Sequence, residues 1–507
     1  MLRTVLSVGL AAVLWLTMLS NAKAATFYVS PDGDDGGPGS HSRPFRSLSA
    51  ACGKVPSGTN TIRLSAGLFH EAKTCLIPPG VSVVGGGADR TTLSWSATED
   101  LEANPRRIAP DKFLIQMRNS SGASLSGFRL SGGLGSGGRA HGGILARRVS
   151  RVQIHDITAR SFNLCGIYLS EATASSVHHC TVEDCGHPSR QSCSGGIQVG
   201  DLTDSSVHDC IVREHRGAYG IKGWRFAWGD HDPSGPGDLR LRLVRAAFYR
   251  NDIRVRQQGG WGNGQPNMAL ELWDSRPERC EIYENRFNEC VSLAGGFSAP
   301  KTIRVHHNRF VLEPGYSYAI EVEQNNMEVD HNYFANGYYP LASFTDRKSG
   351  LKIHHNIFDG IEKIQLLYFA GGVSDFQFVN NTVYVHENFP MLVMGGASEG
   401  VLIANNLFYK TGPPQAPPLI VLQKDGNGQQ ATLQSGTLSV THNAFRNWAP
   451  EGSGAVTGDP HLALSGPHAS GEFFRPLPGS PLVGSGLPIP GIASGPRPGV
   501  GAVGAAR

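Results

Sequence analysis

Short segments of alternating apolar and polar residues, separated by turn residues, recur along most of the chain. Seven of them share one phrase, in which such a segment reaches an asparagine and is followed by a second apolar segment: EIYENRF, RVHHNRF, EVDHNYF, KIHHNIF, FVNNTVY, LIANNLF and SVTHNAF. The asparagines are Asn285, Asn308, Asn332, Asn356, Asn381, Asn406 and Asn443, at steps of 23, 24, 24, 25, 25 and 37 residues. A period in the low twenties with one phrase per repeat is typical of a solenoid, whose coils bury their apolar faces against one another.

Less regular copies extend the pattern toward the N-terminus. The phrases SLSGFRL, VQIHDITA, VHHCTV and VHDCIV carry Phe128, Ile157, Cys180 and Cys210 where the later copies carry asparagine. Alternating, β-branched segments between turn residues predict strands rather than helices. We expect the asparagines to form a hydrogen-bonded ladder from coil to coil. The cysteines at the same position are expected to be small buried fillers.

The two ends of the chain differ from the repeats. Residues 1–24 have the features of a secretory signal peptide, with a basic Arg3, an apolar stretch and the small-residue site Ala22-Lys23-Ala24. A membrane anchor is the weaker alternative, and no later stretch is long and apolar enough to span a bilayer. Residues 25–100 are expected to form an N-terminal cap, with a short helix through 48–51, and the first coils. Residues 101–447 are expected to form the main coil, and the Pro- and Gly-rich residues 448–507 a C-terminal cap.

Charge and cysteine content indicate which kinds of partner and which cellular compartment are compatible with the sequence. Without Arg3 and Lys23 the mature chain carries 43 basic and 42 acidic residues, a balance that argues against nucleic acid as the partner. We expect a secreted monomer, and the charge balance neither demands nor excludes a charged polysaccharide as its partner. All nine cysteines lie in the mature part, as in proteins of an oxidising compartment. Cys52 and Cys75 resemble a pair, Cys185 and Cys193 could close a loop, and Cys280 and Cys290 flank one turn. The sequence leaves the disulfide connectivity open, and the odd count leaves at least one free thiol.

Several motifs together resemble one superfamily. The phrases ending H-N-x-F, the opening FYVSPDGDDGGPGSHSRPF, and the late GDP (458–460) with GSPLVGSG (479–486) are similar to secreted proteins of the pectate-lyase-like superfamily. The resemblance covers nearly the whole mature chain. It implies an all-β fold, a single-stranded right-handed parallel β-helix with an N-terminal helical cap and an irregular C-terminal cap. It does not select a reaction, because the superfamily includes lyases, glycoside hydrolases, epimerases, esterases and glycan-binding proteins.

A second strand precedes each turn phrase by about a dozen residues. Its polar or outward positions form a predicted column: Leu145, Tyr168, Gln198, Lys222, Glu271, Glu321 and Ser343. Two residues further on lies a second column: Arg147, Ser170, Gly200, Trp224, Trp273, Glu323 and Thr345. The neighbours of the first column are apolar and should point into the coil, so the columns should face outward. One sheet face is thus expected to form an exposed saccharide cleft.

The repeat is most irregular between Cys210 and Asn285. Long loops are expected within about 213–268, and four of the seven tryptophans lie in this region (Trp224, Trp228, Trp261 and Trp273). Long loops on a rigid scaffold tend to build binding walls, and aromatic rings stack on the apolar faces of sugars. We therefore expect these residues to bind substrate: Tyr168, Gln198, Trp224, Arg225, Trp261, Trp273, Asp274 and Glu323.

The column favours glycoside hydrolysis, which requires two carboxyl groups. Glu271 and Glu321 are the predicted acid and base, with Asp274 and Glu323 in reserve. They should lie two coils apart, about 10 Å between backbones, since coils stack about 4.8 Å apart. Lys222, one coil before Glu271, would hold that carboxylate ionised. This reaction requires no cofactor, and no metal ligands are predicted; the histidine pairs, such as His306-His307, are expected to be stacked structural residues.

Two alternatives remain open at this stage. A polysaccharide lyase would use Lys222, Arg225 or Arg256 to remove a proton beside a uronate carboxyl group, with Ca²⁺ neutralising that group. Arg254 adds to the positive charge available for this reaction. The other alternative is a non-catalytic glycan-binding surface protein.

Overall fold

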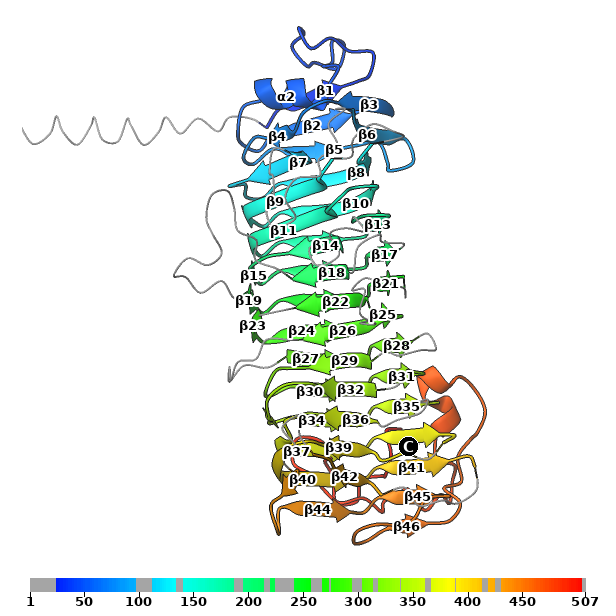
Figure 1. Cartoon of the computed structure of the whole chain (residues 1–507). Coiled ribbons are helices and arrows are strands. Elements are labelled where there is room, and N and C mark those ends of the chain that lie inside the picture. Colours follow the sequence, from blue (N-terminus) through cyan, green and yellow to red (C-terminus); the bar gives the residue numbers. More distant parts are fainter. Residues whose placement is uncertain are drawn as a thin grey trace, which may run out of the picture.

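The structure is a computed structural model of the 507-residue chain (Figure 1). It describes residues 24–96, 112–133, 140–186, 195–213, 219–223, 241–256, 267–272, 275–293, 303–312, 318–337, 339–360, 366–387, 389–412, 418–424 and 430–503. Parallel strands stack one above another along the molecule, from β1 (Thr26–Val29) at one end to β46 (Val456–Thr457) at the other. The fold is the expected right-handed parallel β-helix, and it is nearly all β.

One sheet contains the strands of the predicted columns. From the N-terminal end these strands are β4 (Cys75–Ile77), β7 (Phe113–Arg118), β9 (Gly142–Ser150), β11 (Cys165–Thr173), β14 (Gly195–Val199), β18 (Tyr219–Gly223), β22 (Met268–Leu272), β26 (Cys290–Leu293), β29 (Tyr318–Val322), β32 (Tyr339–Ser343), β36 (Leu367–Phe369), β39 (Leu392–Met394) and β42 (Ile420–Leu422). Each pairs in parallel with the next along the stack. We call it the column sheet.

Two further sets of strands lie on either side of the repeated asparagine. Those before it include β20 (Ala247–Tyr249), β24 (Cys280–Tyr283), β27 (Ile303–His306), β30 (Glu328–Asp330), β34 (Lys352–His354), β37 (Val373–Val379), β40 (Ala397–Ala404) and β44 (Leu438–Thr441). Those after it include β21 (Asp252–Arg254), β25 (Arg286–Phe287), β28 (Arg309–Val311), β31 (Tyr333–Ala335), β35 (Ile357–Asp359), β38 (Thr382–Val385), β41 (Leu407–Lys410) and β45 (Ala444–Arg446). Apolar side chains from all these strands fill one continuous core along the axis.

The asparagines form the predicted ladder. Each amide oxygen accepts the backbone N–H and the side-chain N–H of the asparagine in the preceding coil, at 2.8–3.0 Å and 2.9–3.1 Å. Asn251 extends the ladder by one coil, and its own amide oxygen accepts from the backbone N–H of Cys210. The residue before each ladder asparagine has a left-handed backbone, as at His331 (φ 54°). The side-chain hydrogen bonds therefore stabilise a turn that is unfavourable for most residues.

Replacing Asn332 with alanine should lower the free energy of unfolding by about 1–3 kcal/mol. The substitution removes the acceptor of two donors on Asn308 and the donor to the carbonyl oxygen of Val305. Gln377→Ala is the control, because Gln377 lies on the outer surface of β37 and should change stability by less than about 0.5 kcal/mol. Chemical denaturation of both variants checks the expectation, and equal midpoints would show that the ladder does not stabilise the coil.

The ends of the coil carry additional structure. At the N-terminal end, helix α2 (Leu48–Lys54) begins at an N-cap Ser47, and the backbone N–H groups of Leu48 and Ser49 donate hydrogen bonds to the carboxylate of Glu71. This is the expected helix, extended by one turn. At the other end, β46 adds a last partial coil, and the following residues fold back along the flank of the stack (Figure 1). Asn405, for example, exchanges two hydrogen bonds with Leu487.

The expected disulfides fail where the structure describes both partners. Cys52, Cys75, Cys280 and Cys290 are all buried free thiols. Cys280 belongs to the core inside the coil, whereas Cys290 packs in a separate cluster on the outer face of the column sheet, so their side chains point to opposite sides of the wall. Cys185–Cys193 lies outside the described residues, because Cys193 is not described.

The predicted signal peptide, apart from its last residue Ala24, lies outside the described residues. In the described ranges, no helix has both the length and the apolar composition needed to cross a membrane.

Candidate functional site

The register of the column sheet places the predicted column in one line. Gln198 pairs with Lys222, Lys222 with Glu271, and Glu321 with Ala342. Between Glu271 and Glu321 lies Ser292, which pairs with both. The two glutamates are therefore two coils apart, as expected. The last expected member is wrong by one residue: Ala342 continues the column, whereas Ser343 pairs with Phe369.

Ser292 was not among the expected residues, because the interval to the next ladder asparagine is longer in its coil than in the early copies. Ser292 precedes the next ladder asparagine by 16 residues, whereas the early copies set the interval at 12. The alternation in Cys290-Val291-Ser292-Leu293 was the signal that could have identified it. Beside this coil β22 has an irregularity, since Met268 pairs with Cys290 and Leu270 with Val291. Such bulges change the direction of neighbouring side chains.

The column is much less exposed than expected. Tyr168 and Leu145 have no exposed surface and pack against Phe113, Leu164 and Cys165 in a cluster outside the coil core. Gln198 is also fully buried. The expectation of one open sheet face is therefore wrong at this end of the column. The alternation of side chains predicted correctly which residues point away from the core, but not that other side chains would cover them.

Lys222 and Glu271 form a buried ion pair. The ammonium Nζ contacts Oε2 of Glu271, and only 3% and 4% of the two side chains are exposed. The same ammonium lies 3.5 Å from the ring centroid of Tyr219, which adds a cation–π contact. The carboxylate of Glu271 thus lies next to a compensating positive charge, as the sequence predicted.

Glu321 has a different environment. Its side chain is half-buried, and Oε2 accepts a hydrogen bond from the hydroxyl of Ser292. Burial, followed by the negative charges of Glu323 and Glu271, raises the pKa of Glu321 to about 7, while the Ser292 hydrogen bond opposes the rise. At neutral pH a large fraction of Glu321 is therefore protonated. The column brings together one carboxylate paired with a lysine and one carboxyl group able to donate a proton.

Glu323 lies beside the column but is occupied by structural contacts. Its carboxylate accepts hydrogen bonds from the Ser343 hydroxyl, the Phe344 backbone N–H and the Thr345 hydroxyl, and it pairs with Lys348 at 2.9 Å. Only 3% of Glu323 is exposed. These contacts fix the turn after β32, so the structure offers no free oxygen of Glu323 to a substrate.

Five of the predicted substrate-binding residues lie outside the described residues: Trp224, Arg225, Trp261, Trp273 and Asp274. Arg256, considered as a lyase base, is described and exposed. Its carbonyl oxygen accepts a hydrogen bond from the amide of Asn267.

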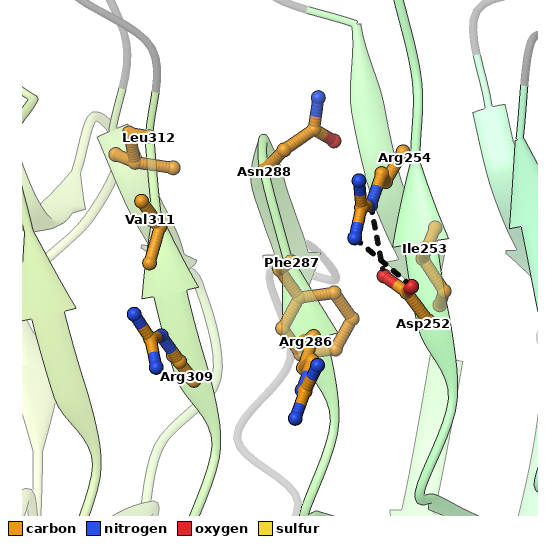
Figure 2. Close-up of a pocket in the computed structure, with 9 residues that line it drawn as sticks. All are labelled: Asp252, Ile253, Arg254, Arg286, Phe287, Asn288, Arg309, Val311 and Leu312. Carbon is orange, nitrogen blue, oxygen red and sulfur yellow. Dashed lines mark hydrogen bonds and ion pairs between the residues drawn. The ribbon is translucent and has the colours of Figure 1, made fainter. Parts of the chain in front are cut away.

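A pocket of about 510 Å³ lies on the strands that immediately precede β22, β26 and β29 in the chain (Figure 2). Its described lining comes from β21, β25, β28 and the residues that follow them: Asp252, Ile253, Arg254, Arg286, Phe287, Asn288, Arg309, Val311 and Leu312. Arg254 was among the residues considered from the sequence, whereas Arg286 and Arg309 were not. Both follow a ladder asparagine directly, in the phrases ENRF and HNRF, and this repeated position was the available signal.

One group of side chains elsewhere has the composition of a metal site, namely Asp330, His331 and His354. Both oxygens of Asp330 are engaged by Arg304 at 2.8 Å, and His354 contacts Glu328 at 3.0 Å. Burial alone would raise the pKa of Asp330, but the Arg304 guanidinium holds it well below its usual range. The group is thus accounted for by protein contacts. His331 also stacks between His307 and His355 at 4.9 Å, which confirms the expected structural role of the histidines.

Comparisons with known proteins agree with the fold. Residues 111–225 match the family model described as a right-handed β-helix region. No curated protein sequence matches this chain.

Several solved structures are similar to this chain at low identity. One is the catalytic unit of a thermostable GH87 α-1,3-glucanase from Streptomyces thermodiastaticus strain HF3-3, with 12% identity over 75% of this chain and 63% of that chain, and a TM-score of 0.40. Another is PfbA, a surface adhesin of Streptococcus pneumoniae, with 9% identity, coverages of 68% and 82%, and a TM-score of 0.40. A third is an alginate lyase from Paenibacillus sp. str. FPU-7, with 12% identity, coverages of 68% and 97%, and a TM-score of 0.36. This chain spans less than two thirds of the glucanase unit, and the likeness concerns the fold alone.

Proposed function

We propose that this protein is a secreted enzyme that cleaves a polysaccharide, and that it is a glycoside hydrolase. In this proposal Glu321 is the general acid and Glu271 the general base. The observation that carries it is the Glu271–Ser292–Glu321 register, which holds two carboxyl groups in one column in opposite environments. Two carboxyl groups close together, one of them ion-paired and the other not, are a typical arrangement for acid–base catalysis.

Each glutamate is suited to its role. The acid must contact the glycosidic oxygen, and Glu321 is the more exposed of the two, with a pKa raised to about 7. The base has only to reach a water molecule, so the burial of Glu271 against Lys222 is compatible with that role. Binding and orienting the sugar would fall to the residues beside the column.

The spacing favours inversion at the anomeric carbon. Two coils separate the backbones of Glu271 and Glu321 by about 10 Å. Retaining enzymes hold their carboxyl groups about 5 Å apart, and inverting enzymes about 6.5–9.5 Å apart to admit a water. Side chains that lean toward one another over Ser292 fit the second range.

The lyase alternative is less well supported by the same geometry. A lysine base must be neutral to accept a proton, yet Lys222 is in direct contact with the carboxylate of Glu271. An ammonium paired with a carboxylate is held in its charged form. Lys222 therefore supports Glu271 better than it would serve as a base.

Activity should fall as the pH rises through about 7. Glu321 must carry its proton to act as the acid, and that proton is lost above its pKa. The test uses the mature protein on neutral and uronate-containing polysaccharides, with and without a calcium chelator, measuring new reducing ends between pH 4 and 9. An unsaturated product whose formation stops when the chelator is added would show that the protein is a lyase and not a hydrolase. Binding of a polysaccharide without any product would favour a glycan-binding protein.

A further inference from the structure

We infer that the pocket of Figure 2 is a binding subsite for carboxylate or sulfate groups on the same polysaccharide, so that the substrate is anionic. This inference rests on the proposed function and adds the substrate class. It is independent of the two glutamates, because none of the described lining residues belongs to the column.

The guanidinium groups of Arg286 and Arg309 lie side by side in the pocket, and that of Arg254 lies further along the neighbouring strand. Arg286 pairs in register with Arg309 on the next strand, and Arg254 follows two residues after Asp252, the register partner of Arg286. All three arginines are exposed. Figure 2 shows them on three neighbouring strands, with Arg254 turned toward Asp252. Because parallel strands lie about 4.8 Å apart, the row can meet successive charged groups of one chain.

The positive charge of the pocket exceeds its negative charge. Asp252 is the only acidic residue among the described lining residues, and its two oxygens are bonded by Arg254 at 3.1 and 3.2 Å. Arg286 makes no side-chain hydrogen bond or ion pair with any described residue. Arg309 has an aromatic neighbour, with its guanidinium carbon 5.6 Å from the ring centroid of Tyr333. Two guanidiniums thus remain free to bind an anion.

The position of the pocket links it to the column. Strands β21, β25 and β28 lead along the chain into β22, β26 and β29, which carry Glu271, Ser292 and Glu321. The pocket and the column are therefore formed by the same three coils. A polymer lying across these coils would contact both.

The chemistry of the row indicates which groups would bind. A guanidinium presents two parallel N–H donors, which match the paired oxygens of a carboxylate or a sulfate. The surrounding lining adds the exposed aliphatic Val311 and the amide of Asn288, which is already bonded to the backbone of Val255. The site therefore favours a charged sugar over a neutral one.

Binding is measured in variants that also carry Glu321→Gln, so that the substrate is not consumed. Cleavage is measured in proteins that keep Glu321. Calorimetry would compare a uronate oligosaccharide, a sulfated oligosaccharide, a neutral glucan oligosaccharide, inorganic sulfate and a short single-stranded DNA. Arg286→Ala and Arg309→Ala should each weaken binding of the anionic oligosaccharide on the order of tenfold. Arg286→Lys should recover part of the loss, because it keeps the charge but not the paired donors. Arg63→Ala, an exposed arginine on β2 (Thr61–Leu64) in the first coils, is the matched control.

The outcomes separate this inference from the proposed function. Arginine-dependent binding of a uronate or sulfated oligosaccharide supports the subsite, and the ligand that binds more tightly identifies the group. Binding that is equal for neutral and anionic sugars, unchanged in both alanine variants, or tightest for DNA overturns it. If a neutral glucan is cleaved while the arginines have no effect, the subsite fails and the hydrolase stands. If the anionic sugar binds through the arginines but wild type leaves it uncleaved, the subsite stands and the proposed function fails.

Discussion

Replacing Glu321 with glutamine is expected to lower kcat by about 10²- to 10⁴-fold, the usual contribution of a general acid or base. Glutamine keeps the shape of the side chain and can still accept the Ser292 hydrogen bond, so the fold should be retained. The loss should be much smaller on an aryl glycoside with an activated leaving group, because such a group departs without a proton. Steady-state kinetics on both substrates, with a thermal unfolding curve, would measure these effects.

The matched control for this substitution is Glu281→Gln. Glu281 is an exposed glutamate on β24, a strand outside the column sheet. Its replacement should leave kcat, KM and stability unchanged. Full activity of Glu321→Gln on the natural polysaccharide would remove Glu321 from the mechanism.

Replacing Lys222 with methionine should destabilise the protein by about 3–5 kcal/mol, because the buried carboxylate of Glu271 would lose its counter-charge. The double variant Lys222→Met/Glu271→Leu should recover most of this stability, since a buried ion pair exchanged for apolar side chains of similar volume is often neutral. The denaturant midpoints of the wild type, Lys222→Met, Glu271→Leu and the double variant would complete a double-mutant cycle.

The double variant also separates structure from catalysis. It should be folded and stable yet inactive, because it lacks the proposed base. A stable double variant with wild-type kcat would show that Glu271 serves only to neutralise Lys222. A Lys222→Met variant as stable as the wild type would show that Glu271 does not need the charge of Lys222 to compensate its burial.

The coil could be predicted because its determinants are local and repeated. The H-N-x-F phrases indicate the period of the repeat, the position of the turn and the side of each strand that faces the core. The asparagine ladder follows from the spacing of these phrases. The column followed from the same alternation, and it correctly joined Lys222, Glu271 and Glu321. The error at Ser343 and the omission of Ser292 have the same cause. The number of residues between the column and the asparagine varies from coil to coil, so counting back from the asparagine does not always give the correct register.

The surroundings of the column could not be predicted in the same way. Alternation determines whether a side chain points into or out of the coil, but burial of the outer face depends on contacts between segments distant in sequence. Tyr168 and Gln198 were therefore expected at a surface and are buried. The Cys280–Cys290 pair failed because the two residues, although near in sequence, lie on opposite faces of the wall. Arg286 and Arg309 were missed because ENRF and HNRF were interpreted only as turn phrases.

The most direct test of the account is the proton NMR spectrum of the first products released from the polysaccharide that the protein cleaves. The proposed pair, Glu321 as acid and Glu271 as base on the second coil away, predicts new reducing ends whose anomeric configuration is opposite to that of the cleaved bond, with no vinyl proton. Reducing ends that retain the configuration would contradict the proposed spacing of the two carboxyl groups. A vinyl proton of an unsaturated sugar would contradict hydrolysis itself.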